Sequence, residues 1–173
     1  MLVEPIFWVN KPDGNGDGIL QAYVSGTEDI PFPIETHNVA ENDVKLNEKQ
    51  EFEIVLECVD IPGIYGNEQE FYNSGKHKKM AAQSIIPIGL FPASDDKEFE
   101  PSPLIYLNGR VTDIFEIPEQ IGFDENDILF SLACLGNEFD CVLYNGQDEN
   151  IKIQQGNTVS GVFYVQGWPA EDG

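Results

Sequence analysis

The chain has 173 residues, of which 31 are Asp or Glu and 9 are Lys or Arg, so its formal net charge at pH 7 is −22. This charge argues against nucleic acid as a partner, because nucleic-acid affinity comes largely from Lys and Arg side chains that displace counterions. An apolar content of 41% is enough for a folded core and argues against a wholly disordered chain.

The three cysteines indicate the compartment. Cys58, Cys134 and Cys141 each lie inside an apolar run, which is typical of buried, reduced thiols. The first residues lack the basic and apolar segments of a signal peptide, and no apolar run approaches the roughly 20 residues that a membrane span needs. We therefore expect a cytoplasmic protein that contacts no membrane.

The N-terminal part predicts a hairpin followed by a loop. Residues 2–9 and 19–24 are apolar enough for two strands, and the Gly, Asn and Asp residues between them are typical of a polar turn. Residues 28–47 are predicted as loop, because Pro31 and Pro33 interrupt them and their apolar residues show no clear period.

The polar turn also resembles the opening of a calcium-binding loop. Asp13, Asn15 and Asp17 alternate as oxygen donors and Gly18 follows them, but the twelfth position of the loop is Val24 in place of a bidentate Glu. We predict weak calcium binding, with a dissociation constant on the order of 10⁻⁴ to 10⁻³ M, and otherwise expect no cofactor. The alternative is a polar turn without a metal. His37 nearby is interpreted in two ways, as a metal or acid–base group or as a solvated loop histidine.

Residues 51–59 show the clearest strand pattern. Phe52, Ile54, Leu56 and Cys58 fall on one face, whereas the other face carries the carboxylates of Glu51, Glu53 and Glu57. These three glutamates are either a solvated face or a stripe that contacts a partner.

Residues 68–83 predict one helix. Asn67 would cap it, Glu70 would return a hydrogen bond to the cap, and Gly75 would weaken its middle. The segment ends in a basic cluster of Lys76, His77, Lys78 and Lys79. These cations either neutralise neighbouring acids, such as the three glutamates, or contact an anion or a partner.

The C-terminal half predicts strands. Residues 104–117 form either one long strand with a glycine bulge or a hairpin that turns at Asn108-Gly109. Residues 128–168 predict a four-stranded antiparallel meander, with turns at Gly136-Asn137, Asn145-Gly146 and Gly156-Asn157.

Together these patterns predict a mainly β protein with one short helix. We expect an antiparallel barrel of the OB-like kind, or a bent sandwich, built on the C-terminal meander. The chain is predicted as a single domain over residues 1–173, with a possible subdivision near Asp95 into residues 1–95 and 96–173.

Two functions fit the sequence. The first is a non-enzymatic, acidic binding protein that engages a basic protein partner, for example an immunity or inhibitor protein that masks a basic toxin; Glu51, Glu53, Glu57, Lys76, Lys78 and Lys79 are its candidate contacts. The second is a small hydrolase or carbohydrate-binding domain that uses carboxylates with Trp8 and Trp168. No catalytic residue is assigned, because no spacing of Ser, Cys, His and acids predicts a catalytic group.

Overall fold

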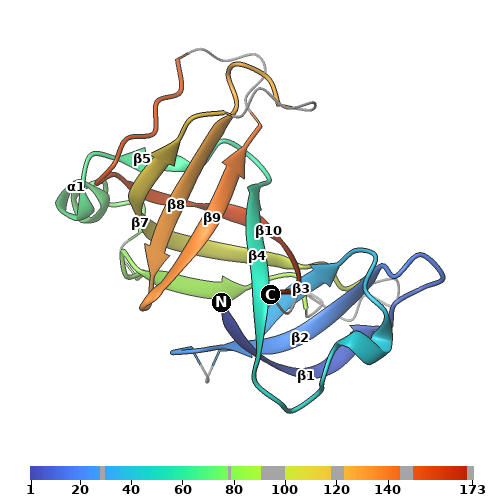
Figure 1. Ribbon diagram of the computed structural model, residues 1–173. Coiled ribbons are helices and arrows are strands. Elements are labelled where there is room, and N and C mark those ends of the chain that lie inside the picture. Colours follow the sequence, from blue (N-terminus) through green and yellow to red (C-terminus); the bar gives the residue numbers. More distant parts are fainter. Residues whose placement is uncertain (28–29, 78, 91–99, 118–122, 145–149, 171–173) are drawn as a thin grey trace. The chain divides into compact units, whose positions relative to one another are not determined.

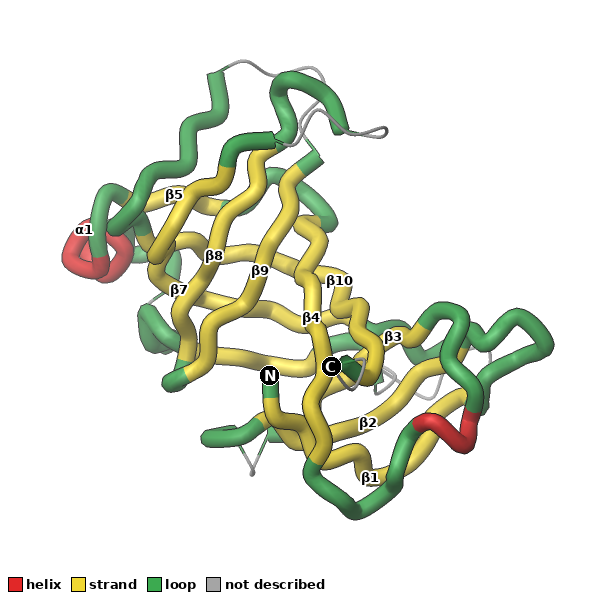
Figure 2. The backbone as a smooth tube through the Cα atoms, viewed as in Figure 1, coloured by secondary structure: helices red, strands yellow, loops and turns green. Residues whose placement is uncertain are grey.

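The computed structural model describes residues 1–27, 30–77, 79–90, 100–117, 123–144 and 150–170. Strands account for 51% of the described residues and helices for 6%, which confirms the predicted mainly β class. Figure 2 shows this composition, with strands drawn in yellow and helices in red.

The secondary-structure elements follow in chain order (Figure 1). The strands are β1 (Leu2–Asn10), β2 (Gly18–Val24), β3 (Phe32–Thr36), β4 (Gln50–Cys58), β5 (Gly63–Tyr65), β6 (Ser84–Pro87), β7 (Leu104–Phe115), β8 (Ile128–Cys134), β9 (Asn137–Leu143) and β10 (Thr158–Pro169). The helices are a 3₁₀ turn, η1 (Glu41–Asp43), and one α-helix, α1 (Glu68–Asn73).

The chain divides into two compact units, each built from separate segments. The first unit comprises Met1–Val55, Ile86–Ile105 and Tyr164–Gly173, and the second comprises Leu56–Ile85 and Tyr106–Phe163. Asp95, where a subdivision was predicted, lies outside the described residues.

The first unit is built on the predicted hairpin. β1 and β2 pair antiparallel, β2 pairs antiparallel with β3, and β1 pairs antiparallel with β4 at Leu2 and Glu51. β3 pairs in parallel with β10 at Glu35 and Gln166. Fully buried side chains of this unit include Val3, Leu20, Val24, Phe32, Ile34, Phe52 and Val165.

β3 lies in a segment that was predicted as loop, and that prediction is wrong. Phe32, Ile34 and Thr36 alternate along the strand and are fully buried, so apolar burial outweighs the effect of the prolines. Pro33 lies opposite Gln21 of β2 and lacks an N–H, so it donates no ladder hydrogen bond at this position.

The second unit contains an antiparallel meander of β7, β8 and β9, which lie side by side in Figure 1. The predicted four-stranded meander over residues 128–168 is wrong in its later part. Residues 150–157 contain no strand, and β10 pairs with β5 and β7 rather than following β9 in a meander. Residues 145–149, with the predicted Asn145-Gly146 turn, lie outside the described residues.

The β8–β9 hairpin is present, with its turn one residue earlier than predicted. Cys134 and Asn137 form the last pair, so Leu135 and Gly136 are the two turn residues, with φ of 49° and 81°. Two successive positive φ angles are what a type I′ hairpin turn requires. Gly156, in the next predicted turn, also has a positive φ of 89°.

The predicted helix over residues 68–83 is present only in its first part. The side chain of Asn67 accepts a hydrogen bond from the N–H of Glu70, which confirms the predicted cap. The Glu70 carboxylate accepts from the N–H of Gly66 at 2.9 Å, one residue before the cap to which the bond was predicted to return. The helix ends at Asn73, and Gly75 has a φ of 68°. This left-handed residue ends the helix rather than interrupting it.

Residues 104–115 form one strand, so the alternative of a hairpin at Asn108-Gly109 is wrong. The register of β7 against β8 shifts between Val111 and Asp113, three residues beyond the predicted glycine bulge. No helix within the described ranges is long and apolar enough to span a membrane.

Candidate functional site

The β4 carboxylates lie as the alternating pattern predicts. Glu51 and Glu53 are exposed on the strand, while Phe52 and Ile54 between them are buried. The indole N–H of Trp168 donates a 2.9 Å hydrogen bond to Oε2 of Glu53. In the first unit, therefore, one exposed carboxylate is held beside an aromatic side chain.

Glu57, the third carboxylate of the strand, belongs to the second unit and lies near a pair of exposed aromatic rings. Tyr144 is 51% exposed, and Phe123 stacks on it with ring centroids 6.0 Å apart. Partial burial raises the pKa of Tyr144, and the negative charges of Glu57 and Asp127 raise it further. Glu57, Phe123 and Tyr144 are named the Tyr144 surface below.

Two lysines of the basic cluster, Lys76 and Lys79, belong to the described residues of the second unit. Lys76 and Lys79 are exposed, and neither has a carboxylate within 4.0 Å in the described part of the chain. Lys78 lies outside the described residues.

His77 has a structural role. Its ring stacks on Phe71 with centroids 4.7 Å apart and an interplanar angle of 3°, and its Nε2 is 2.8 Å from the hydroxyl of Tyr65. Phe71 is fully buried, so the three rings fasten α1 and the turn after it to β5.

In the predicted calcium loop, a carboxylate oxygen proposed as a calcium ligand accepts hydrogen bonds from the loop backbone. Oδ1 of Asp13 accepts from the N–H of Asn15 at 2.7 Å and from the N–H of Asp17 at 3.2 Å, and these hydrogen bonds hold the pKa of Asp13 below its ordinary value. Among the described residues, no group of three His, Cys, Asp or Glu side chains is arranged to hold a metal ion. The calcium site stays a prediction.

His37 links this loop to β3. Its Nδ1 is 3.1 Å from Oδ1 of Asp17, and its Nε2 is 2.9 Å from Oε2 of Glu35. Each ring nitrogen of His37 is thus within hydrogen-bonding distance of a carboxylate oxygen. Asp43 does not join this group, since its Oδ2 accepts from the N–H of Ala40.

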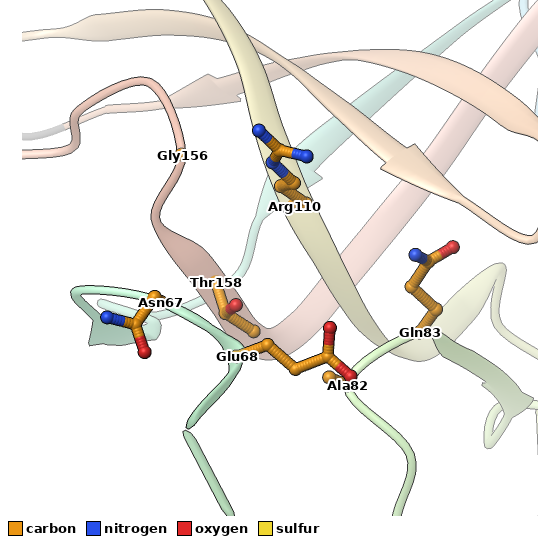
Figure 3. Close-up of a pocket in the computed structure, with 7 residues that line it drawn as sticks. All are labelled: Asn67, Glu68, Ala82, Gln83, Arg110, Gly156 and Thr158. Atoms are coloured by element: carbon orange, nitrogen blue, oxygen red, sulfur yellow. The ribbon is translucent and has the colours of Figure 1, made fainter. Parts of the chain in front are cut away.

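The second unit contains a polar cavity that sequence reasoning missed. Its volume is about 280 Å³, and its lining comes from α1, from the residues before β6, from β7 and from the start of β10 (Figure 3). The lining residues are Asn67, Glu68, Ala82, Gln83, Arg110, Gly156 and Thr158. One feature of the amino-acid composition could have pointed to this cavity, because Arg110 is the only arginine in the chain.

Three comparisons were made with known proteins. No family model, curated protein or solved structure matches this chain. The functions proposed below therefore rest on the chain's own residues.

Proposed function

We propose that this protein is a non-enzymatic, acidic binding protein that engages a basic protein partner. One observation carries the proposal: among the described residues, Lys11 is the only lysine or arginine with a carboxylate within 4.0 Å, that of Glu41 at 2.7 Å. With a formal net charge of −22, most of the negative charge is therefore not compensated by ion pairs inside the chain. A basic surface on another protein would supply the missing cations and would be attracted over a distance.

The carboxylates of β4 are the contacts proposed first. Glu51 and Glu53 of the first unit are exposed, and in the second unit Glu57 lies near exposed aromatic rings. Aromatic side chains are enriched at protein interfaces, and a Lys or Arg placed over such a ring gains about 0.5–2 kcal/mol. The Tyr144 surface therefore suits a basic side chain better than carboxylates alone would. An immunity or inhibitor protein that masks a basic toxin is one form of this function.

The first unit is proposed to be an OB-like barrel. Support comes from the ladder order β10–β3–β2–β1–β4 and from a further pairing between β10 and β4. The N–H of Ala170, directly after β10, also donates to the carbonyl of Glu51 at 2.9 Å. In this order the last strand, β4, pairs with the first, β10, as the strands of a small closed barrel do. Such a barrel often serves as a binding module.

The alternative, a hydrolase or carbohydrate-binding domain, is favoured by the contact between Glu53 and Trp168. Such a site needs a hollow in which carboxylates and an aromatic ring meet a sugar. None of the three cavities described in the chain has Trp8 or Trp168 in its lining. The binding-protein proposal is therefore preferred.

Capture of partners from a native lysate tests the proposal. The bait is the wild-type protein, a triple variant (Glu51→Gln, Glu53→Gln, Glu57→Gln) and a control triple variant with the same change in charge (Glu48→Gln, Glu116→Gln, Glu125→Gln). All six glutamates belong to the described residues, and those of the control are exposed. We expect mass spectrometry to identify one abundant basic protein with the wild type and the control, and much less of it with the β4 variant.

A second pair of variants separates the aromatic contact from general charge. Tyr144→Ala should reduce recovery of the same protein, whereas Phe7→Ala, which removes another ring that is 47% exposed, should not. Recovery of no basic protein, or equal loss with both triple variants, would contradict a specific contact at these residues.

A further inference from the structure

Arg110 has no ion-pair partner among the described residues, although the chain contains 31 acidic residues. It lies on β7 opposite Ala133 of β8, and Ala133 in turn lies opposite Glu138 of β9. The Glu138 carboxylate accepts a hydrogen bond from the hydroxyl of Thr112. The guanidinium of Arg110 thus lines the cavity with its five N–H groups unused by any described carboxylate.

Other polar side chains of the cavity also have hydrogen-bond donors that are not used within the described chain. Oδ1 of Asn67 already accepts from the N–H of Glu70, and Oε1 of Gln83 already accepts from the N–H of Leu135 at 3.1 Å. Their NH₂ groups have no partner in the described chain. Thr158 is only 2% exposed, yet its hydroxyl lines the cavity without a partner there. A lining that combines a guanidinium with unused N–H and O–H donors is suited to a carboxylate.

Glu68 is the one acidic side chain of the lining, and it is not within 4.0 Å of Arg110. A site with one cation and one separate anion matches a ligand that carries both charges. A dianionic phosphate would be repelled by Glu68 and by the net charge of −22, whereas a zwitterion has no net charge to repel. The volume of about 280 Å³ lies just below the about 300–1,000 Å³ typical of small-molecule pockets, which suits a small ligand.

We propose that this cavity binds a free amino acid, with its carboxylate on Arg110, Gln83 and Thr158 and its ammonium group on Glu68. None of its lining residues is a proposed partner contact on β4.

The lining is held in place before a ligand enters. Asn108, fully buried on β7 two residues before Arg110, donates from Nδ2 to the carbonyl of Ala81 and to the hydroxyl of Ser84, both at 2.9 Å. These bonds flank Ala82 and Gln83, which line the cavity. A ligand therefore meets a fixed segment, which lowers the entropy cost of binding.

The single arginine makes the test direct. In a ¹⁵N-labelled sample, Arg110 gives the only arginine side-chain Nε–H signal, so its shift reports on this site alone. The twenty amino acids are added one at a time, with acetate, methylammonium, inorganic phosphate and N-acetylated amino acids as probes that lack one of the two charges. We expect at least one amino acid to move the signal saturably, and its N-acetylated form to bind about tenfold more weakly.

Two variants assign the charges. Arg110→Lys keeps the charge but loses the planar guanidinium, and is expected to weaken amino-acid binding by about tenfold. Glu68→Gln is expected to weaken binding of the amino acid and leave its N-acetylated form unaffected. Thermal unfolding shows whether each variant is folded.

Three results would overturn the proposal. The first is no shift of the Arg110 signal with any amino acid added at concentrations up to about the millimolar range typical of weak binding. The second is binding of phosphate as tight as that of amino acids, and the third is an equal effect of Glu68→Gln on the binding of the amino acid and of its N-acetylated form. None of these outcomes depends on whether a basic protein partner exists.

Discussion

Nε2 of His77 lies 2.8 Å from the hydroxyl of Tyr65, and the histidine ring stacks on Phe71. These contacts give a structural role to His77, a residue that the sequence groups with the basic cluster. We expect His77→Ala to lower the free energy of unfolding by about 1–2 kcal/mol, because it removes a stacked ring and a partly buried hydrogen bond.

Chemical denaturation checks this expectation, with two controls. Tyr65→Phe removes only the hydroxyl and should cost about 0.5–1.5 kcal/mol. Lys79→Ala, at an exposed residue without an ion-pair partner, should change stability by less than about 0.5 kcal/mol. Equal effects of His77→Ala and Lys79→Ala would show that the ring contacts do not stabilise the fold.

The turn before β2 gives a second prediction. Gly16 has a φ of 83°, and a Cβ on it would lie 2.6 Å from the backbone nitrogen of Val39. Gly16→Ala should therefore destabilise the protein by about 1–3 kcal/mol. Gly14 is the matched control, since a Cβ there meets nothing within 4 Å and its φ is not positive. Thermal unfolding that gives the same midpoint for both variants would contradict the described turn.

The cysteines give a pH-dependent prediction. Burial raises the pKa of Cys58 and of Cys134 from the ordinary 9.0 to about 12, and raises that of Cys141 well above 9.0. At pH 8 the thiolate fraction of Cys58 and Cys134 is then lower by about a thousandfold than in an unfolded chain, and thiolate is the reactive form. A disulfide reagent such as DTNB should therefore react slowly with the native protein and with three thiols after unfolding in guanidinium.

The same raised pKa values affect stability at high pH. The unfolded chain releases its thiol protons near pH 9, whereas the folded chain keeps those of Cys58 and Cys134 until about pH 12. Stability is thus unaffected by these groups below pH 9 and falls as the pH rises from 9 towards 12. Rapid reaction of the native thiols at pH 8 would show that they are not buried as described.

Calcium binding by the loop of Asp13, Asn15 and Asp17 is tested by isothermal titration. Weak binding, on the order of 10⁻⁴ to 10⁻³ M, is expected for the wild type and should be lost in Asp17→Ala. Binding would also release Asp17 from His37, so His37→Ala should not weaken it. If wild type and Asp17→Ala give the same heat at millimolar calcium, the loop does not bind the ion.

The sequence predicted best the elements whose burial follows a simple period. β4 shows this, because its alternating apolar residues are buried and its exposed glutamates are two residues apart. The β1–β2 hairpin and the β8–β9 hairpin were also predicted, since their turns are rich in residues that suit a tight reversal.

The missed elements have identifiable physical causes. β3 was hidden by its prolines, and the helix was predicted too long because the left-handed conformation of Gly75 is not evident from its neighbours. The cavity around Arg110 joins residues 67 and 158, and the Tyr144 surface joins residues 57 and 144. No local pattern brings such distant positions together, so only the fold could reveal both.

The central claim is that a basic protein binds the uncompensated carboxylates of this chain. The most direct test is the association rate between the protein and the basic protein captured on it, measured by surface plasmon resonance as the ionic strength rises. We predict a rate that falls steeply, by about tenfold or more between 50 and 500 mM salt, because the Debye length shortens over this range and steering is lost. A rate that does not change with salt would contradict the proposed role of the acidic surface.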